Sequence, residues 1–270
     1  MKNRFSITLV TALILALFTA SSFAMKTSCG EHYVGGEAPD IINAKMQAKT
    51  QELCYDEFGV VHSGLTRTPL WSAEHLTRSR LDAARGMVRK DTFHAEERLP
   101  ESDRAELSDY ARSGFDRGHM SPNADMSTDQ AQHESFSLAN IVPQDGTNNR
   151  GIWSGIESAV RTLAKREGNL YVITGPLFVG NNVKALKRRV LVPTHIYKIV
   201  YSPKRNAAGV YLVNNAAEAD LRYISVAELE QMAGIDFFPS MSPAVKREIM
   251  PLPKPKERRG GGKRHGRTYR

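Results

Sequence analysis

The segment from Gly151 to Ala164 constrains the fold more than any other part of the chain. Apolar residues recur in it with helical spacing, at Ile152, Ile156, Ala159, Val160 and Leu163. The helical pattern stops at Gly168, and a short apolar run at 170–174 follows directly, closed by Gly175-Pro176. We therefore predict an amphipathic helix that is followed immediately by a buried strand.

Other segments extend this pattern to an α+β fold. Residues 58–62, 69–76, 190–201 and 209–213 have the composition of strands, and a turn at 202–206 joins the last two into a long hairpin. Helical features occur at 101–110, where Ser102 can act as a cap, and between Ser225 and Gly234, where Glu228 completes a capping box. This order predicts a mostly antiparallel mixed sheet flanked by helices.

The N-terminus has the features of a secretory signal peptide. Lys2 and Arg4 precede an uncharged apolar run at 7–18, and Ser22-Phe23-Ala24 supplies the small residues that signal peptidase needs. We predict a signal peptide at 1–24, cleaved near Ala24, and a periplasmic or secreted protein. No later run of about 20 apolar residues exists, so no membrane span is expected.

Residues 25–250 contain no repeat and no linker, and we predict a single domain there, followed by a basic, disordered tail at 251–270. The formal net charge of +8 lies mostly in the leader and in the tail, so the domain itself is nearly neutral. The tail could bind polyanions through salt-sensitive contacts. It could equally be a solubilising or proteolytically trimmed extension, and the sequence leaves both alternatives open.

The chain has two cysteines, Cys29 and Cys54. Metal binding or nucleophilic catalysis would need His or acidic neighbours at ligand spacing, and two cysteines are few for either role. In an oxidising compartment such a pair typically forms a structural disulfide. We predict this bridge, which would contribute about 3 kcal/mol in the chain-entropy model.

Residues 115–122, Phe-Asp-Arg-Gly-His-Met-Ser-Pro, place an acid, a cation, a glycine and an imidazole side by side. Gly118 lets the backbone approach another group closely or adopt a positive φ. His119 titrates near neutral pH and is a candidate general base, whereas the other seven histidines lack such neighbours. We interpret this motif as a site in which His119 faces a phosphodiester.

Asn149 and Glu157 are candidates for a metal site. Mg²⁺ keeps most of its waters and needs only one or two protein oxygens, so one amide oxygen can suffice. Asn149 could instead belong to a turn or cap a helix. If the helix reaches back to Asn149, Glu157 lies about 80° around it, close enough to serve the same site. Glu157 could instead form a surface ion pair with Arg161.

Cations are clustered on both sides of the motif in the sequence. Such clusters are usually solvated faces, but they would form an electropositive approach for a polyanion if both flanked His119 in space. The members are Arg78, Arg80, Arg85, Arg89 and Lys90 upstream, and Lys184, Lys187, Arg188 and Arg189 downstream.

Four stretches between about Trp71 and Pro239 resemble the DNA/RNA non-specific endonuclease family. They are Asp116-Arg117-Gly118-His119, Asn140-Ile141-Val142-Pro143-Gln144, Asn149-Arg150-Gly151-Ile152-Trp153 with Glu157, and Thr174-Gly175-Pro176. The resemblance implies a ββα-metal active site that hydrolyses DNA and RNA without base specificity and leaves 5′-phosphate ends.

The resemblance also implies roles for single residues. His119 would be the general base, Asn149 the ligand of Mg²⁺ or of Mn²⁺ in its place, and Glu157 the group that holds metal-bound water. Arg89 and Arg117 would complete the catalytic set, supported by Asp116, Asn140 and Arg161. Two alternatives stay open: a nucleic-acid-binding protein without activity, which would not need His119, and a metal-dependent phosphodiesterase for a small substrate, which would need a closed pocket.

Overall fold

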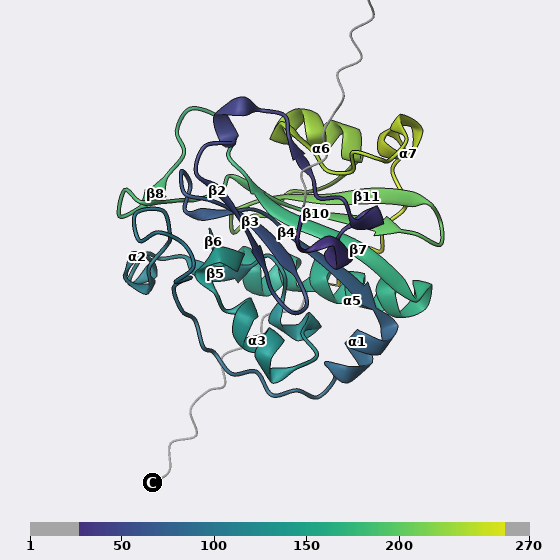
Figure 1. Ribbon diagram of the computed structural model, residues 1–270, viewed down its shortest axis with the longest axis horizontal. Coiled ribbons are helices and arrows are strands. Elements are labelled where there is room, and N and C mark those ends of the chain that lie inside the picture. The colour runs from purple at the N-terminus through teal and green to yellow at the C-terminus, as the bar shows by residue number, and fades with distance from the viewer. Residues whose placement is uncertain (1–26, 257–270) are drawn as a thin grey trace, which may run out of the picture.

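The computed structural model describes residues 27–256 and has a seven-stranded antiparallel sheet at its centre (Figure 1). The strands follow the order β12-β11-β10-β7-β4-β3-β2. They are β2 Thr50–Cys54, β3 Gly59–Ser63, β4 Thr68–Thr77, β7 Asn169–Leu177, β10 His195–Ser202, β11 Ala207–Asn214 and β12 Leu221–Ile224. This architecture confirms the predicted α+β class. The predicted signal peptide at 1–24 lies outside the described residues.

Short strands form three further pairs, β1 with β13, β5 with β6, and β8 with β9. They are β1 Asp40–Ile41, β13 Ile235–Asp236, β5 Asp116–His119, β6 Ile141–Gln144, β8 Ala185–Leu186 and β9 Val190–Leu191. The helices are α1 Arg78–Ala83, α2 Leu107–Tyr110, α3 Asp129–Ser135, α4 Gly146–Asn148, α5 Ser154–Glu167, α6 Val226–Ala233 and α7 Pro243–Arg247, with short 3₁₀ turns between them. No helix within residues 27–256 is both long and apolar enough to cross a bilayer.

Helices cover both faces of the sheet, with α6 on one face and α5 on the other (Figure 1). Side chains of a strand alternate between the two faces. On β10, Tyr197 and Ile199 belong to the core under α6, whereas Ile196 and Val200 belong to the core under α5. The β5-β6 hairpin and α3 lie on the α5 side in Figure 1, so this side carries the predicted motif.

Most of the predicted elements are present, and two differ for local reasons. The predicted helix at 101–110 is only α2, because Glu106 caps it and its backbone N–H donates a hydrogen bond to the Asp109 carboxylate. Ser102 donates its hydroxyl hydrogen to Asp103 instead of capping a helix. The long strand expected at 190–201 is interrupted between β9 and β10 at Pro193, which lacks the N–H that a ladder needs.

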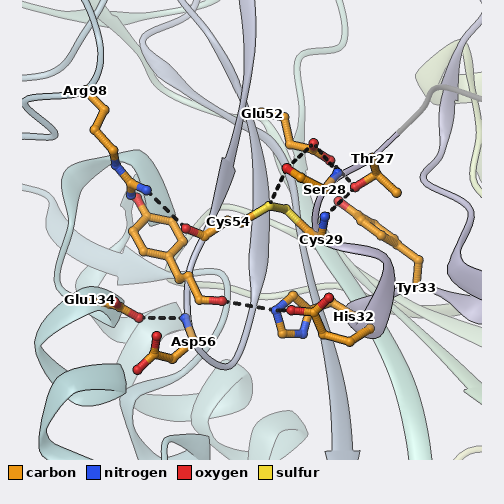
Figure 2. The surroundings of a disulfide bond; sticks show 12 residues. Thr27, Ser28, Cys29, His32, Tyr33, Glu52, Cys54, Asp56, Arg98 and Glu134 are labelled. Atoms are coloured by element: carbon orange, nitrogen blue, oxygen red, sulfur yellow. Dashed lines mark hydrogen bonds and ion pairs between the residues drawn. A yellow bond between two sulfur atoms is a disulfide. The ribbon is translucent and has the colours of Figure 1, made fainter.

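The predicted disulfide joins Cys29 and Cys54, whose Cα atoms lie 5.4 Å apart (Figure 2). It ties the N-terminal arm to the end of β2. The carboxylate of Glu52 on the same strand accepts hydrogen bonds from the Thr27 hydroxyl and from the Ser28 backbone nitrogen at 3.1 Å. The arm is therefore held by a covalent bond and by hydrogen bonds at one place.

Residues 251–256, which we assigned to the tail, lie against the domain. The Tyr211 hydroxyl donates to Pro253 O at 2.7 Å, and Met250 N donates to Ala208 O at 2.8 Å. A Cβ at Gly155 on α5 would come within 2.8 Å of Lys256 O. The start of the predicted tail thus packs on β11 and α5, while residues 257–270 lie outside the described part of the chain.

Candidate active site

The Asp-Arg-Gly-His motif forms strand β5, which pairs with β6. Its antiparallel register pairs His119 with Ile141 and Gly118 with Val142. A Cβ at Gly118 would lie 2.1 Å from Gln144 Oε1 and 2.7 Å from Gln144 Cβ. Gly118 is therefore required by close approach between the two strands, which is one of the two roles that its sequence position suggested.

His119 lies in a largely apolar environment at the end of β5, with 8% of its surface exposed. Its ring centroid is 5.4 Å from that of Phe93 and 5.0 Å from that of Phe136. Burial, assisted by the positive charge of Arg89, lowers the pKa of His119 to about 3. Its Nε2 is buried and has no hydrogen-bond partner among the described residues. The imidazole is therefore neutral, with a free ring nitrogen.

Asn149 begins a π-helical turn, Asn149–Trp153, and not the regular helix. Gly151 has φ −98° and ψ −105° there, and α5 starts only at Ser154. The regular helix therefore does not reach back to Asn149, and the condition for the angle of about 80° between Asn149 and Glu157 is not met. Single π turns of this kind are frequent at functional sites.

Five of the predicted site residues line one cavity of about 400 Å³. They are His119, Arg89, Arg117, Asn149 and Glu157. Arg89 and Arg117 extend over aromatic rings, with guanidinium carbons 5.1 Å from the Phe136 centroid and 4.0 Å from the Phe93 centroid. Such cation–π contacts hold flexible cations in place while leaving their N–H groups free to bind an anion.

Glu157 lies in this cavity without an ion pair in the part of the chain that the structure describes. Its possible partner Arg161 instead forms an ion pair with Asp125 at 3.0 Å. Burial raises the pKa of the Glu157 carboxyl, and the charges of Arg161 and Lys198 oppose this effect. The surface ion pair considered for Glu157 and Arg161 is therefore absent.

The three residues expected to support the site lie around this cavity rather than in its wall. Asp116 accepts a hydrogen bond from Asn149 Nδ2 at 3.0 Å and pairs with Arg150 at 2.7 Å. The fully buried Asn140 accepts from Ser121 N at 3.0 Å and donates to Ser121 O at 2.9 Å. Asn140 thus shapes the turn that follows His119, and Asp116 orients the amide of Asn149.

The donor set suits a hard divalent cation. The amide nitrogen of Asn149 is engaged by Asp116, so its carbonyl oxygen is the atom left for a cation. The carboxylate of Glu157 lines the same cavity. Oxygen donors of this kind and small number match the preference of Mg²⁺ and Mn²⁺, which retain several waters when bound.

Two buried titratable side chains, Lys198 and Glu74, were not anticipated from the sequence. Lys198 on β10 is fully buried and donates to Thr174 Oγ1 at 2.6 Å and to Met120 O at 3.4 Å. Burial lowers its pKa, and burial raises the pKa of Glu74 to about 8. One signal was available in the sequence. Lys198 lies two residues from Ile196 and two from Val200, so its side chain is on the same face of the strand as theirs, toward the core under α5.

The two predicted basic clusters do not both flank His119. Arg80 is buried and pairs with Glu57 at 3.3 Å and with Glu74 at 3.4 Å. Of the upstream cluster, Arg89 alone lines the cavity described above. Lys184 and Lys187 of the downstream cluster line a separate cavity that also contains Phe115.

Comparison with known proteins finds similarity to nucleases. Residues 38–244 match the family model of DNA/RNA non-specific endonucleases. The chain is 36% identical over 198 residues to mitochondrial nuclease EXOG of Danio rerio, covering 65% of this chain and 57% of that protein. It is 33% identical over 204 residues to nuclease C1 of Cunninghamella echinulata, covering 68% and 81% respectively.

Mitochondrial endonuclease G of Caenorhabditis elegans is 33% identical over 210 residues, covering 70% of this chain and 68% of that protein. A crystal structure of the EndoG/EndoGI complex matches with a TM-score of 0.62 and 27% identity, covering 72% of this chain and 88% of that chain. This chain spans just over half of the length of the EXOG nucleases that it matches, 57% and 58% for those of Danio rerio and Homo sapiens.

These relatives contradict the prediction of a periplasmic or secreted protein. EXOG of fish and human, endonuclease G of the nematode and the yeast relative are all named as mitochondrial nucleases. An apolar N-terminal segment with small residues was thus an insufficient basis for assigning the compartment. The family itself is clear from the match over most of the described domain, and the chain belongs to the DNA/RNA non-specific endonuclease family.

Proposed function

We propose that this protein is a Mg²⁺-dependent endonuclease that hydrolyses both DNA and RNA without base specificity and leaves 5′-phosphate ends. One observation carries the proposal: a neutral buried imidazole, two cations, an amide and a carboxylate line one cavity. These are the groups that phosphodiester hydrolysis needs, namely a base, positive charge near the phosphate, and oxygen ligands for a cation.

His119 is the proposed general base. Its free Nε2 can accept a proton from a water molecule as that water attacks the phosphorus atom. Contacts with the rings of Phe93 and Phe136 restrict the imidazole, so little orientation has to be established during the reaction. The low pKa of His119 keeps the imidazole in its proton-accepting form before substrate arrives.

Arg89 and Arg117 are the proposed phosphate-binding groups. Guanidinium groups bind phosphate oxygens through fixed pairs of N–H donors and remain charged at all relevant pH values. Arg89 also forms an ion pair with Asp91 at 2.7 Å, with both side chains more than half exposed. An incoming phosphate can therefore displace this carboxylate at little cost, because exposed ion pairs contribute little.

Asn149 is the proposed metal ligand, and Glu157 is the proposed group that holds metal-bound water. Asn149 offers its carbonyl oxygen, which Asp116 directs by binding the amide nitrogen, and the carboxylate of Glu157 would accept hydrogen bonds from metal-bound water in the same cavity. A divalent cation at this position would supply charge for the phosphate and for the departing 3′ oxygen. Phosphate and sugar contacts of this kind carry no base information, which supports cleavage without base specificity.

A substrate of extended shape is supported by the neighbouring cavity. A second cavity of about 540 Å³ shares Arg89, Arg117, Asn149 and Arg150 with the first. A nucleic acid chain can continue from one to the other, whereas a phosphodiesterase for small substrates would need a closed pocket. The alternative of a binding protein without activity has no use for the buried imidazole.

Digestion of supercoiled plasmid and of bulk RNA, each with Mg²⁺ or with EDTA, tests the proposal. Wild-type protein is compared with His119→Ala and with His195→Ala, whose imidazole lies outside the cavity. We expect Mg²⁺-dependent loss of both substrates by wild type and by His195→Ala, and none by a His119→Ala protein that keeps its circular dichroism spectrum. Product ends should accept ³²P from polynucleotide kinase only after phosphatase treatment. Wild-type protein that retards DNA but leaves both substrates intact would refute the proposal in favour of a binding protein.

A further inference from the structure

The second cavity, lined by Phe93, Leu107, Tyr110, Phe115 and Arg117 among others, is built differently from the first. One side is apolar and partly aromatic, and the other carries the cations that it shares with the first cavity. Its volume of about 540 Å³ lies in the range of small-molecule binding sites. This combination of flat apolar surface and cations suits a nucleobase attached to a phosphate.

Tyr110 forms part of the apolar side of this cavity. The side chain is 6% exposed, and its hydroxyl has no hydrogen-bond partner anywhere in residues 27–256. A buried hydroxyl without a partner is unfavourable, so unpaired groups of this kind are uncommon. Burial raises the pKa of Tyr110, so the hydroxyl stays protonated.

We propose that the second cavity binds the base of an unpaired nucleotide adjacent to the phosphate that is hydrolysed at His119. The inference rests on the proposed function and specifies its substrate class. The base stacks against Phe115, while Arg117, held over Phe93 at 4.0 Å, lies beside its phosphate. A base in a duplex has to leave its stack and its partner base to enter, which is unfavourable. Single-stranded DNA and RNA are therefore the preferred substrates.

A third cavity shows where the chain continues. It has a volume of about 500 Å³, shares Ala111 and Phe115 with the second, and is also lined by Lys184 and Lys187. Phe115 is thus placed between the cations of the active site and a second pair of cations. This arrangement, an aromatic platform between phosphate-binding groups, is typical of proteins that hold single-stranded nucleic acid.

Fluorescence of 2-aminopurine tests the base site without requiring cleavage. A single-stranded oligonucleotide with 2-aminopurine next to its central phosphate is titrated with His119→Ala protein in Mg²⁺, because stacking quenches this base. Ala111→Trp, at an exposed position, fills the cavity without removing a buried group, and Phe115→Ala removes the platform. Val179→Ala, 48% exposed and elsewhere, is the matched control.

We expect 2-aminopurine fluorescence to be quenched by His119→Ala protein and by His119→Ala protein that also carries Val179→Ala. Adding Ala111→Trp or Phe115→Ala to His119→Ala should abolish this quenching. Binding should weaken roughly 10- to 100-fold, as for removal of one base–aromatic stack. In the active background, the ratio of kcat/KM for single strands to that for duplex should fall at least about 10-fold in both variants.

Two outcomes separate this inference from the proposed function. If wild type cleaves neither substrate but stacking is seen and is lost in Ala111→Trp, the nuclease proposal fails and the base site stands. If wild type cleaves both substrates while quenching is absent, or persists in folded Ala111→Trp, the base site is refuted and the nuclease proposal is unaffected.

Discussion

Gly118→Ala should separate β5 from β6 and displace the catalytic imidazole. The new Cβ would lie 2.7 Å from Gln144 Cβ, whereas ordinary contact begins near 3.4 Å. The strands must therefore move apart by about 0.7 Å at this point, and His119 is the next residue along β5. Overpacking of this size costs about 1–3 kcal/mol. A catalytic group misplaced by about 1 Å loses about 100-fold in rate.

Urea denaturation and Mg²⁺-dependent plasmid nicking measure these two effects. Gly30→Ala is the matched control, because its Cβ would meet its nearest neighbours, atoms of Gly36, at an ordinary 3.5 Å. Adding Gln144→Gly to Gly118→Ala removes both clashing atoms and should recover activity relative to Gly118→Ala alone, giving a coupling energy in a double-mutant cycle. A Gly118→Ala protein with wild-type stability and activity within about 3-fold would refute the explanation. So would a double variant that recovers nothing.

Two further predictions concern interactions around the end of β2. Hydrogen bonds from Arg98 and Tyr55 outweigh burial and lower the pKa of Glu96 to about 2, below its ordinary 4.5. This stabilisation is present above about pH 4.5 and is lost as the pH falls toward 2, so Glu96→Gln should cost about 3 kcal/mol at pH 7 and clearly less at pH 3, by urea denaturation. Replacing Cys29 and Cys54 together by Ala should lower the free energy of unfolding by about 3 kcal/mol while leaving nuclease activity in the native protein.

Either result can be contradicted directly. A penalty for Glu96→Gln that is equal at pH 7 and pH 3 would mean that the carboxylate charge is not what stabilises the fold. An unchanged denaturation midpoint after loss of both cysteines would mean that Glu52 and its hydrogen bonds hold the arm without the disulfide.

Local sequence patterns predicted the elements whose signals lie within a few residues. The apolar stripe of α5, the β-branched run of β7 and the cap at Ser225 depend only on spacing along one segment, and each is present. The failures also have local causes. Gly151 breaks the helix before Ser154, and Pro193 interrupts the strand before β10.

The sequence by itself determined which chemical groups are available: an imidazole, an amide, a carboxylate and arginines in stretches that resemble one nuclease family. Only the tertiary structure decided how they are combined. The pairing of β5 with β6 and the packing of α5 on the sheet bring His119, Asn149 and Glu157 to one cavity. Burial then sets the proton affinity of His119 and leaves the hydroxyl of Tyr110 unpaired. Both effects depend on neighbours that are remote in sequence, because exclusion of water is a property of the packed fold and not of a motif.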